Sequence, residues 1–265
     1  MSEQIIGLQD WFDSPAGAYL LAWEQAQFDA AVADLFGYHA LQLGVPSLQA
    51  LRANRMPHRW LALQDVPEAG SPQLAVADFL TDFTALPFPA NSIDLLVLPH
   101  ALEFSADPHA ALREVERVLV PEGRVLICGL NPASLWGWRQ QRSRWWQRWS
   151  GVGAFLPEWG GLIGYWRLRD WLRLLSFEVE VGRFGCYRPA LDSPDWLRRW
   201  EWMDRLGRRW WPIFGAAYFL VATKRVRGIR LMGSVRRPAA KRKVAAVPVA
   251  RQGRVGLDEL PAKNP

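Results

Sequence analysis

Glycine and polar residues stand directly after several short apolar runs of this sequence. Gly44, Asp82 and His100 each follow such a run within two residues. If the runs are parallel strands, these residues lie at the carboxyl edge of one sheet, where open parallel sheets bind ligands. We therefore expect a ligand site at that edge.

His100 is the residue of this group best suited to moving a proton near neutral pH. One interpretation makes it a general base, and the other a satisfied structural group at the start of a helix. Glu103 fits a structural role, because a carboxylate stabilises the first turn of a helix. Asp94 begins a strand at the opposite edge of the sheet, so we interpret it as structural.

Only two cysteines occur, Cys128 and Cys186. A disulfide between them stays open, and two buried thiols in a reducing cytoplasm are the simpler interpretation. Neither cysteine has a partner at ligand spacing, so the sequence predicts no metal site.

Strands and helices that alternate along the chain would position these residues. Such alternation predicts an α/β fold with a doubly wound, mainly parallel sheet of seven strands. The apolar runs predict strands over residues 38–43, 60–63, part of 74–81, 93–98, 124–128, 177–181 and 216–222. Spacing, caps and prolines predict helices over residues 11–36, 46–53, 107–119, 167–175 and 196–209.

The chain divides by composition into three parts. Ser14 and Pro15 are typical of a helix start, so residues 1–34 form an N-terminal helical extension. Residues 35–225 form the α/β domain. Residues 226–265 have no apolar periodicity and predict a disordered basic tail.

The charge is concentrated at the end of the chain. Apolar residues make up 50% and charged residues 22%, which excludes global disorder. Residues 224–265 hold 12 basic and 2 acidic residues, although the whole chain has a net charge of only +6. Such a tail favours weak, salt-dependent contact with nucleic acid, and a plain solubility tail is the alternative.

The sequence shows no targeting or membrane-spanning segment. Its N-terminus lacks the basic start and apolar run of a secretory signal. The longest apolar stretch, residues 210–223, is broken by Pro212 and Gly215 and is too short to span a bilayer. We expect a cytoplasmic protein with no transmembrane segment.

A spaced series of short motifs occupies the middle of the chain. It comprises Asp82, Leu86-Pro87-Phe88, Ser92-Ile93-Asp94, Leu102-Glu103 and Val120-Pro121-Glu122-Gly123. The series resembles the class I S-adenosylmethionine-dependent methyltransferases of the type 11 group, over roughly residues 35–225. Two further motifs, Phe36-Gly37-Tyr38-His39 and Gly129-Leu130-Asn131-Pro132, resemble a bacterial subgroup of uncharacterised methyltransferase-like proteins with basic tails. The resemblance implies a Rossmann-like sheet whose last strand is antiparallel.

The resemblance also implies roles for residues at the carboxyl edge. Asp82 would accept a hydrogen bond from the adenine amino group of S-adenosylmethionine, and the backbone of Phe83 would meet the ring edge. Pro99 and His100 would line the methionine end and the sulfonium. Asp65 would bind the ribose hydroxyls. The structural alternative for both Asp65 and Asp82 is a turn residue.

The first loop departs from the family pattern, which is an acidic residue, an apolar residue and Gly-x-Gly-x-Gly. Here Gln42 replaces the acid and Gly44 is retained, whereas Pro46 and Leu48 stand where the family has glycine. Gln42 can still hydrogen-bond the methionine ammonium or a water. Losing a charge-assisted contact costs about 1.5–3 kcal/mol, so cofactor binding is expected to be weak or lost.

Two segments interleave tryptophan with arginine, around residues 136–149 and 196–205. Such a surface suits stacked bases, an anionic lipid headgroup or another acidic acceptor. The alternative is an amphipathic helix that packs its tryptophans on the core.

We therefore expect an S-adenosylmethionine-dependent methyltransferase with an unknown acceptor. The alternative is a catalytically inactive methyltransferase-like scaffold whose basic tail binds nucleic acid or protein. A nicotinamide dehydrogenase ranks last, because residues 44–49 do not supply the Gly-x-Gly-x-x-Gly that it needs.

Overall fold

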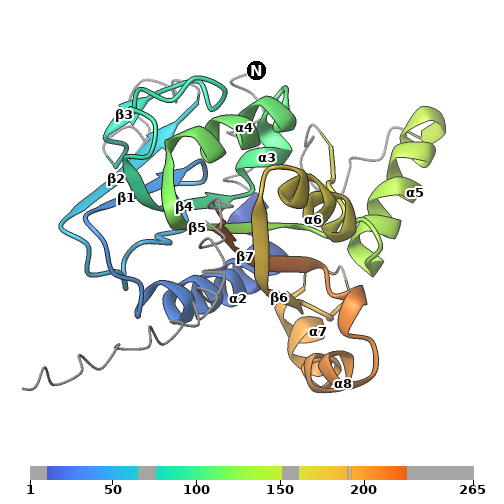
Figure 1. The fold of residues 1–265 in the computed structure, drawn as a ribbon. Coiled ribbons are helices and arrows are strands. Elements are labelled where there is room, and N and C mark those ends of the chain that lie inside the picture. Colours follow the sequence, from blue (N-terminus) through green and yellow to red (C-terminus); the bar gives the residue numbers. More distant parts are fainter. Residues whose placement is uncertain (1–10, 65–75, 151–160, 190, 192, 226–265) are drawn as a thin grey trace, which may run out of the picture. The chain divides into compact units, whose positions relative to one another are not determined.

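A single sheet of seven strands organises the described part of the chain (Figure 1). The computed structural model describes residues 11–64, 76–150, 161–189, 191 and 193–225. The strand order is β3-β2-β1-β4-β5-β7-β6. The strands are β1 His39–Leu43, β2 His58–Leu63, β3 Phe79–Leu80, β4 Ile93–Pro99, β5 Leu119–Leu130, β6 Phe177–Gly185 and β7 Ala217–Lys224.

The direction of the strands confirms the predicted fold class. Strands β1 to β5 are parallel to one another, whereas β7 runs antiparallel to both β5 and β6. β4 lies near the centre and is buried along nearly its whole length, as its continuous apolar run predicts. The carboxyl ends of β1 to β5 therefore meet at one edge of the sheet.

Helices cover both faces of this sheet (Figure 1). Helix α2 packs on one face, and the apolar sides of α4 and α6 pack on the other. The helices are α2 Pro15–Val32, α3 Ala101–Phe104, α4 Pro108–Val118, α5 Leu135–Ser150, α6 Tyr165–Leu174, α7 Pro194–Arg199, α8 Trp202–Trp210 and the 3-10 turn η1 Pro212–Phe214. Among the described residues, no helix combines the length and the apolar character that a membrane crossing requires.

Two predicted helix starts are confirmed. The Ser14 hydroxyl accepts a hydrogen bond from the Gly17 amide at 3.1 Å, and Pro15 is the first residue of α2. Asp107 caps α4 in the same way, through the amide of Ala110 at 2.9 Å.

The helix predicted over residues 46–53 is wrong. Residues 44–57, all of which the structure describes, connect β1 to β2 through turns. The side-chain amide of Gln42 bonds the carbonyls of Val45 and Leu48, which a helix would use for its own hydrogen bonds. Helix α2 packs against this connection instead.

Two other elements differ from prediction. The helix expected over residues 196–209 breaks at Trp200 into α7 and α8. The turn expected at Pro121 to Gly123 lies inside β5, where the pairing with β4 slips its register and Glu122 adopts a positive φ of 63°. Such a bulge absorbs the turn residues without ending the strand.

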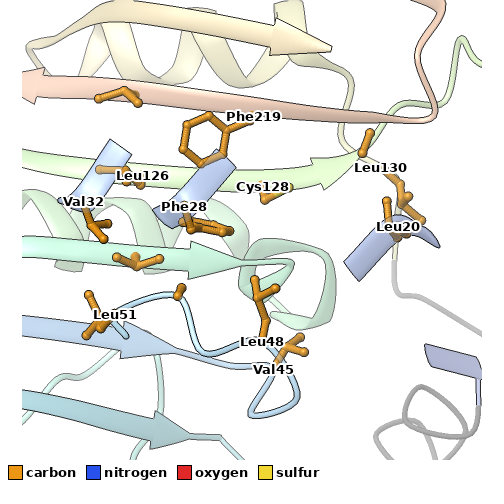
Figure 2. Close-up of a cluster of buried hydrophobic side chains, with 14 of the residues drawn as sticks. Leu20, Phe28, Val32, Val45, Leu48, Leu51, Leu126, Cys128, Leu130 and Phe219 are labelled. Atoms are coloured by element: carbon orange, nitrogen blue, oxygen red, sulfur yellow. The ribbon is translucent and has the colours of Figure 1, made fainter. Parts of the chain in front are cut away.

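Helix α2 belongs to the core on one face of the sheet (Figure 2). Phe28 meets Phe219 of β7 edge to face, with ring centroids 5.0 Å apart. Leu20 and Val32 are fully buried in the same cluster, which also contains Val45 and Leu48 from the β1–β2 connection. Helix α2 and strand β7 are therefore packed together.

The predicted division into residues 1–34, 35–225 and 226–265 stays a prediction. The basic tail lies outside the described residues, and so does its expected contact with nucleic acid.

The buried Phe28 ring gives the first testable prediction. Replacing it in Phe28→Ala leaves a cavity between α2 and β7, so we expect the free energy of unfolding to fall by about 3–5 kcal/mol. Urea denaturation followed by circular dichroism measures this loss. Phe36→Ala is the matched control, since Phe36 is 80% exposed; equal losses in both variants would contradict the packing of α2.

Candidate functional site

Gly44 begins the loop at the carboxyl edge of β1. Its φ is +92°, a conformation that side chains rarely adopt. A Cβ there would stand 3.3 Å from the carbonyl oxygen of Pro99 and 3.4 Å from the Cβ of Ala101. Glycine at this position therefore lets the β1 loop lie against the turn that follows β4.

The rest of the β1 loop is held from inside by Gln42. Its Nε2 donates to the carbonyls of Val45 at 3.0 Å and Leu48 at 2.6 Å, and its Oε1 accepts from the Ala50 amide at 3.0 Å. Leu48 points into the core with Val45 (Figure 2). The bulk of Leu48 is thus accommodated by the core, while the amide of Gln42 is committed to the loop.

A hollow of about 300 Å³ opens beside this loop. Its lining includes Pro46 and Leu48 of the loop, Arg59 and Trp60 of β2, and Asp78, which directly precedes β3. The hollow lies against the connection that replaces the predicted helix.

The end of β2 carries an unsatisfied acceptor. The side-chain oxygen Oε1 of Gln64 is buried and has no hydrogen-bond partner among the residues described. Sequence reasoning missed Gln64 and chose its neighbour Asp65, which lies outside the described residues. The only available signal was the position of Gln64, one residue after the β2 strand.

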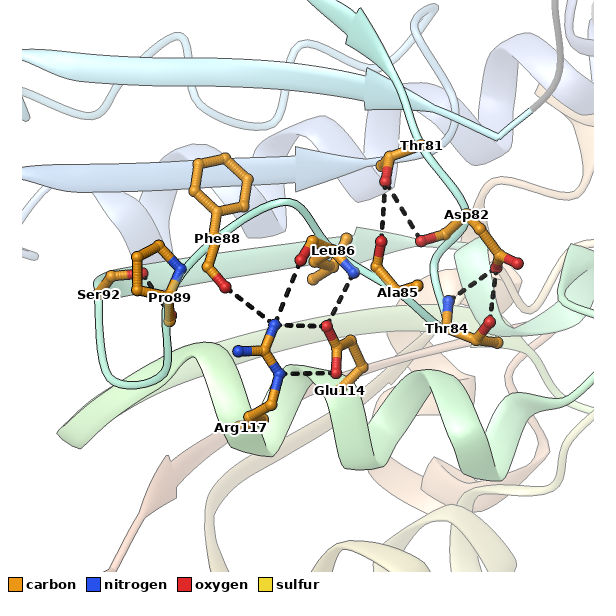
Figure 3. A network of polar contacts seen from close by, with 10 residues as sticks. All are labelled: Thr81, Asp82, Thr84, Ala85, Leu86, Phe88, Pro89, Ser92, Glu114 and Arg117. Atoms are coloured by element: carbon orange, nitrogen blue, oxygen red, sulfur yellow. Dashed lines mark hydrogen bonds and ion pairs between the residues drawn. The ribbon is translucent and has the colours of Figure 1, made fainter.

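Asp82 follows β3 and closes a tight turn (Figure 3). Its Oδ1 accepts from both the amide and the hydroxyl of Thr84 at 2.8 Å, and these bonds lower the pKa of the carboxyl group. The carboxylate is exposed, whereas Phe83 beside it is buried in the core. The turn interpretation of Asp82 is confirmed; its contact with adenine stays a prediction.

Helix α4 fastens the segment that follows Asp82 (Figure 3). The Glu114 carboxylate accepts from the Leu86 amide at 2.8 Å and pairs with Arg117. Arg117 in turn donates to the carbonyls of Leu86 and Phe88 at 3.2 and 2.9 Å. The spaced motifs of the sequence thus form one hydrogen-bonded unit between β3 and α4.

His100 lies beneath the carboxyl edge, fully buried, in a left-handed conformation with φ 54°. Its Nε2 lies 2.8 Å from Oε1 of Glu24 on α2, and its Nδ1 lies 2.7 Å from Oε2 of Glu103. Glu103 also accepts from the amide of Leu130 at 2.7 Å. Sequence reasoning gave Glu103 a structural role but missed Glu24, which is 76 positions from His100.

These carboxylates set the charge of the imidazole. Burial alone would lower the pKa of His100, but the field of Glu24 and the hydrogen bonds that the ring donates to Glu103 and Glu24 raise this pKa to about 10. Burial raises the pKa of Glu103, against the opposing hydrogen bond from His100. The imidazole is therefore charged at neutral pH, so it is not poised to accept a proton.

Both cysteines are free and buried. Burial and the field of Glu24 raise the pKa of the Cys128 thiol, which donates to Oε1 of Glu24 at 3.2 Å. The ligand atoms of Glu24, His100 and Cys128 lie within 4.8 Å of one another, a grouping that sequence spacing did not reveal. Bonds of about 2.0–2.3 Å to tetrahedral zinc would separate such atoms by about 3.3 Å or more. The shortest contact, 2.8 Å between His100 and Glu24, is instead a hydrogen bond.

The first tryptophan–arginine segment divides between core and surface. Trp136 is buried and donates through Nε1 to the carbonyl of Arg188 at 2.8 Å, as the packing interpretation predicts. Trp138 is exposed, with the Arg142 guanidinium 4.8 Å from its ring centre. The side chains of residues 143–150 lie outside the described part.

Comparison with known proteins relates this chain to methyltransferases. A family model described as a methyltransferase domain matches residues 61–127. The chain is 30% identical over 184 residues to the uncharacterized protein YafS of Escherichia coli K12, covering 69% of this chain and 70% of YafS.

Two relatives that are named as methyltransferases match shorter stretches. The demethylmenaquinone methyltransferase of Chlamydia pneumoniae is 34% identical over 71 residues, covering 27% of this chain and 31% of that protein. The malonyl-[acyl-carrier protein] O-methyltransferase of Halorhodospira halophila is 35% identical over 97 residues, covering 37% and 28%.

Solved structures share the fold. A chain from the complex of the Haloferax volcanii Trm112 methyltransferase activator with a methyltransferase superposes with a TM-score of 0.52 at 20% identity, covering 83% of this chain and 99% of that one. A SAM-dependent methyltransferase from Thermotoga maritima superposes with a TM-score of 0.55 at 15% identity, covering 84% and 98%.

The raised pKa of His100 predicts a pH-dependent stability. In the unfolded chain a histidine titrates near pH 6.5, so the stabilisation from the charged imidazole is complete below about that pH. It is lost as the pH rises toward the folded-state pKa of about 10. We expect the imidazole to keep both ring protons at pH 8, which nitrogen-15 NMR of the histidines detects.

Glu24→Gln removes one charge that holds this proton, so His100 should lose a proton at lower pH in that variant. Its free energy of unfolding should then fall less between pH 7 and pH 9 than that of the unmodified protein. The control is Glu201→Gln, because Glu201 is exposed. An imidazole that is already neutral at pH 7 in the unmodified protein would contradict the charge assignment.

Proposed function

Because this chain belongs to the class I S-adenosylmethionine-dependent methyltransferases of the type 11 group, we propose that it transfers a methyl group from S-adenosylmethionine to an acceptor. The observation that carries the proposal is the unit formed by Asp82 to Phe88 with Glu114 and Arg117. This unit contains the most specific motifs and presents the Asp82 carboxylate at the carboxyl edge.

The edge offers groups that fit a nucleoside. Gly44 keeps the β1 loop free of a Cβ at its closest approach to the β4 turn. Gln64 presents an unsatisfied acceptor suited to a ribose hydroxyl, and Asp82 an exposed carboxylate suited to the adenine amino group. In this proposal the backbone of Phe83 lies along the adenine, and the backbone turn of Pro99 and His100 borders the methionine end.

Two predicted contacts have less support. Asp65 lies outside the described residues, so its bond to the ribose stays a prediction. The side-chain amide of Gln42 forms hydrogen bonds with three backbone groups inside the loop, so we propose that Gln42 stabilises the loop rather than binding the cofactor. No acid in the β1 strand then opposes the methionine ammonium.

The sulfonium cofactor supplies an activated methyl group and leaves as a neutral thioether. Transfer therefore needs no general acid, and catalysis depends on alignment of the acceptor and on exclusion of water. His100 fits this scheme as a positioning residue, because both ring nitrogens bind carboxylates and the side chain is fully buried. The two methyltransferases that match shorter stretches are named for different acceptors, so the acceptor of this chain is left open.

A catalytically inactive scaffold is the second candidate. The sequence of the β1 loop favours this candidate, because the loop lacks the acid and two of the three glycines of the family pattern. The loop also leads into turns rather than into a helix. A helix N-terminus would have offered free amides to an anionic group of the ligand.

Isothermal titration with S-adenosylmethionine and S-adenosylhomocysteine distinguishes the two candidates. We expect measurable binding of both ligands, and about tenfold or weaker binding by Asp82→Ala, because a hydrogen bond to a charged group is lost. Asp170→Ala is the control, since Asp170 is exposed on α6 and its side chain is 72% accessible. No heat at millimolar ligand would remove the enzymatic proposal.

A Pro46→Gly variant separates the outcomes further. Binding that appears only in Pro46→Gly would identify the natural protein as a scaffold. Leu48→Gly is unsuitable for this purpose, because Leu48 is buried and its loss would damage the core.

A further inference from the structure

Large apolar side chains project into solvent from the segment that contains α7, α8 and η1. We call them the aromatic ridge: Trp196, Trp202, Leu206, Trp210, Trp211, Ile213 and Phe214. Trp210 is 68% exposed and Trp211 is 51% exposed. Large exposed apolar patches are rare on monomeric proteins, and where they occur they mark interaction surfaces.

The opposite side of α8 is firmly attached to the domain. Asp204 accepts hydrogen bonds from the Tyr187 amide at 3.1 Å and from the Tyr19 hydroxyl, and it pairs with Arg188 at 2.8 Å. Gly207 lies against the Tyr187 ring, since a Cβ there would stand 2.3 Å from it. The exposure of the ridge is therefore a fixed property of the fold rather than fraying of a loose helix.

The ridge has the residue arrangement of an interfacial helix. Consecutive helical residues are about 100° apart, so Trp202, Leu206 and Trp210 fall within about 80° of one another. Arg205 and Arg209 flank this stripe on the side away from the domain. A helix that lies in a membrane interface combines an apolar stripe with a basic face and places tryptophan at the headgroup level.

The charges of the segment favour an anionic surface. Residues 194–214 contain five arginines and three acidic residues. Two of these acids are already paired, Asp195 with Arg198 and Asp204 with Arg188. Arg205, Arg208 and Arg209 make no ion pair with any residue that the structure describes, so their charge is available to phosphate groups.

Leu206 and Ile213 help to identify the partner. A surface for single-stranded nucleic acid uses aromatic rings on which bases stack. Aliphatic side chains offer no such stacking, but they enter the hydrocarbon boundary of a bilayer together with tryptophan. We propose that the aromatic ridge docks the protein on an anionic lipid bilayer.

The 3-10 turn η1 relates this surface to the rest of the fold. The side chain of Asn131, just after β5, donates to the carbonyls of Ile213 at 2.7 Å and Gly215 at 3.0 Å. Ala217, the first residue of β7, pairs with Leu130 at the carboxyl end of β5. The ridge thus adjoins the same edge of the sheet that carries Gly44 and Asp82.

Vesicle sedimentation with the full-length protein tests the proposal. The probes are vesicles of phosphatidylcholine alone and of equal parts phosphatidylcholine and phosphatidylglycerol, at near-physiological salt. We expect binding to the anionic vesicles, and at least about tenfold weaker binding by the double variant Trp210→Ser/Trp211→Ser, which keeps every charge. Trp166→Ser is the matched control, because Trp166 is 59% exposed on α6, outside the ridge.

Several results would overturn the proposal. Equal vesicle binding by the natural protein and the double variant would assign the binding to the basic tail, and absence of binding would remove lipid as the partner. Unchanged vesicle binding combined with lost binding to a single-stranded oligonucleotide would assign the ridge to nucleic acid. A dimer that only the double variant dissociates, without vesicle binding, would assign it to a second copy of the chain.

Discussion

The contact between Glu24 and His100 joins helix α2 to the turn after the central strand β4, and the carboxyl edge depends on it. Glu103 holds the other ring nitrogen and also binds the Leu130 amide, so α2, the β4 turn and the end of β5 meet at one imidazole. Removing one partner of such a buried pair typically costs about 3–5 kcal/mol, because the remaining charge has no compensation. The geometry of the carboxyl edge is therefore maintained by the buried side chains of Glu24, His100 and Glu103.

The sequence predicted correctly those elements whose structure depends on interactions between residues close together in the chain. The continuous apolar run of β4, the Asp107–Pro108 start of α4 and the turn at Asp82 all act within a few positions of the chain. The β1 loop was predicted wrongly. The apolar spacing over residues 46–53 is typical of a helix, but the Gln42 side chain binds the carbonyls of Val45 and Leu48. The Glu24–His100 pair was equally invisible, since no periodicity connects residues so far apart in sequence.

The two conspicuous motif regions of the family differ in how strongly the fold constrains them. Arg117 reaches the carbonyls of Leu86 and Phe88 while bound to Glu114, so both the spacing and the residue types of this region are fixed by geometry. The β1 loop is fixed differently, through one side-chain amide and burial of Leu48 in the core. Its departure from the glycine pattern therefore leaves the sheet intact, although turns replace the helix that was predicted after β1.

The pairing of Phe28 with Phe219 governs the order in which the molecule is completed. Helix α2 leaves the ribosome early, but its partner in β7 is synthesised about 190 residues later, so this contact must wait for nearly the whole domain. During that interval Leu20, Phe28 and Val32 have no finished surface on which to pack. The packing of α2 is consequently completed only after nearly all of the domain has been synthesised.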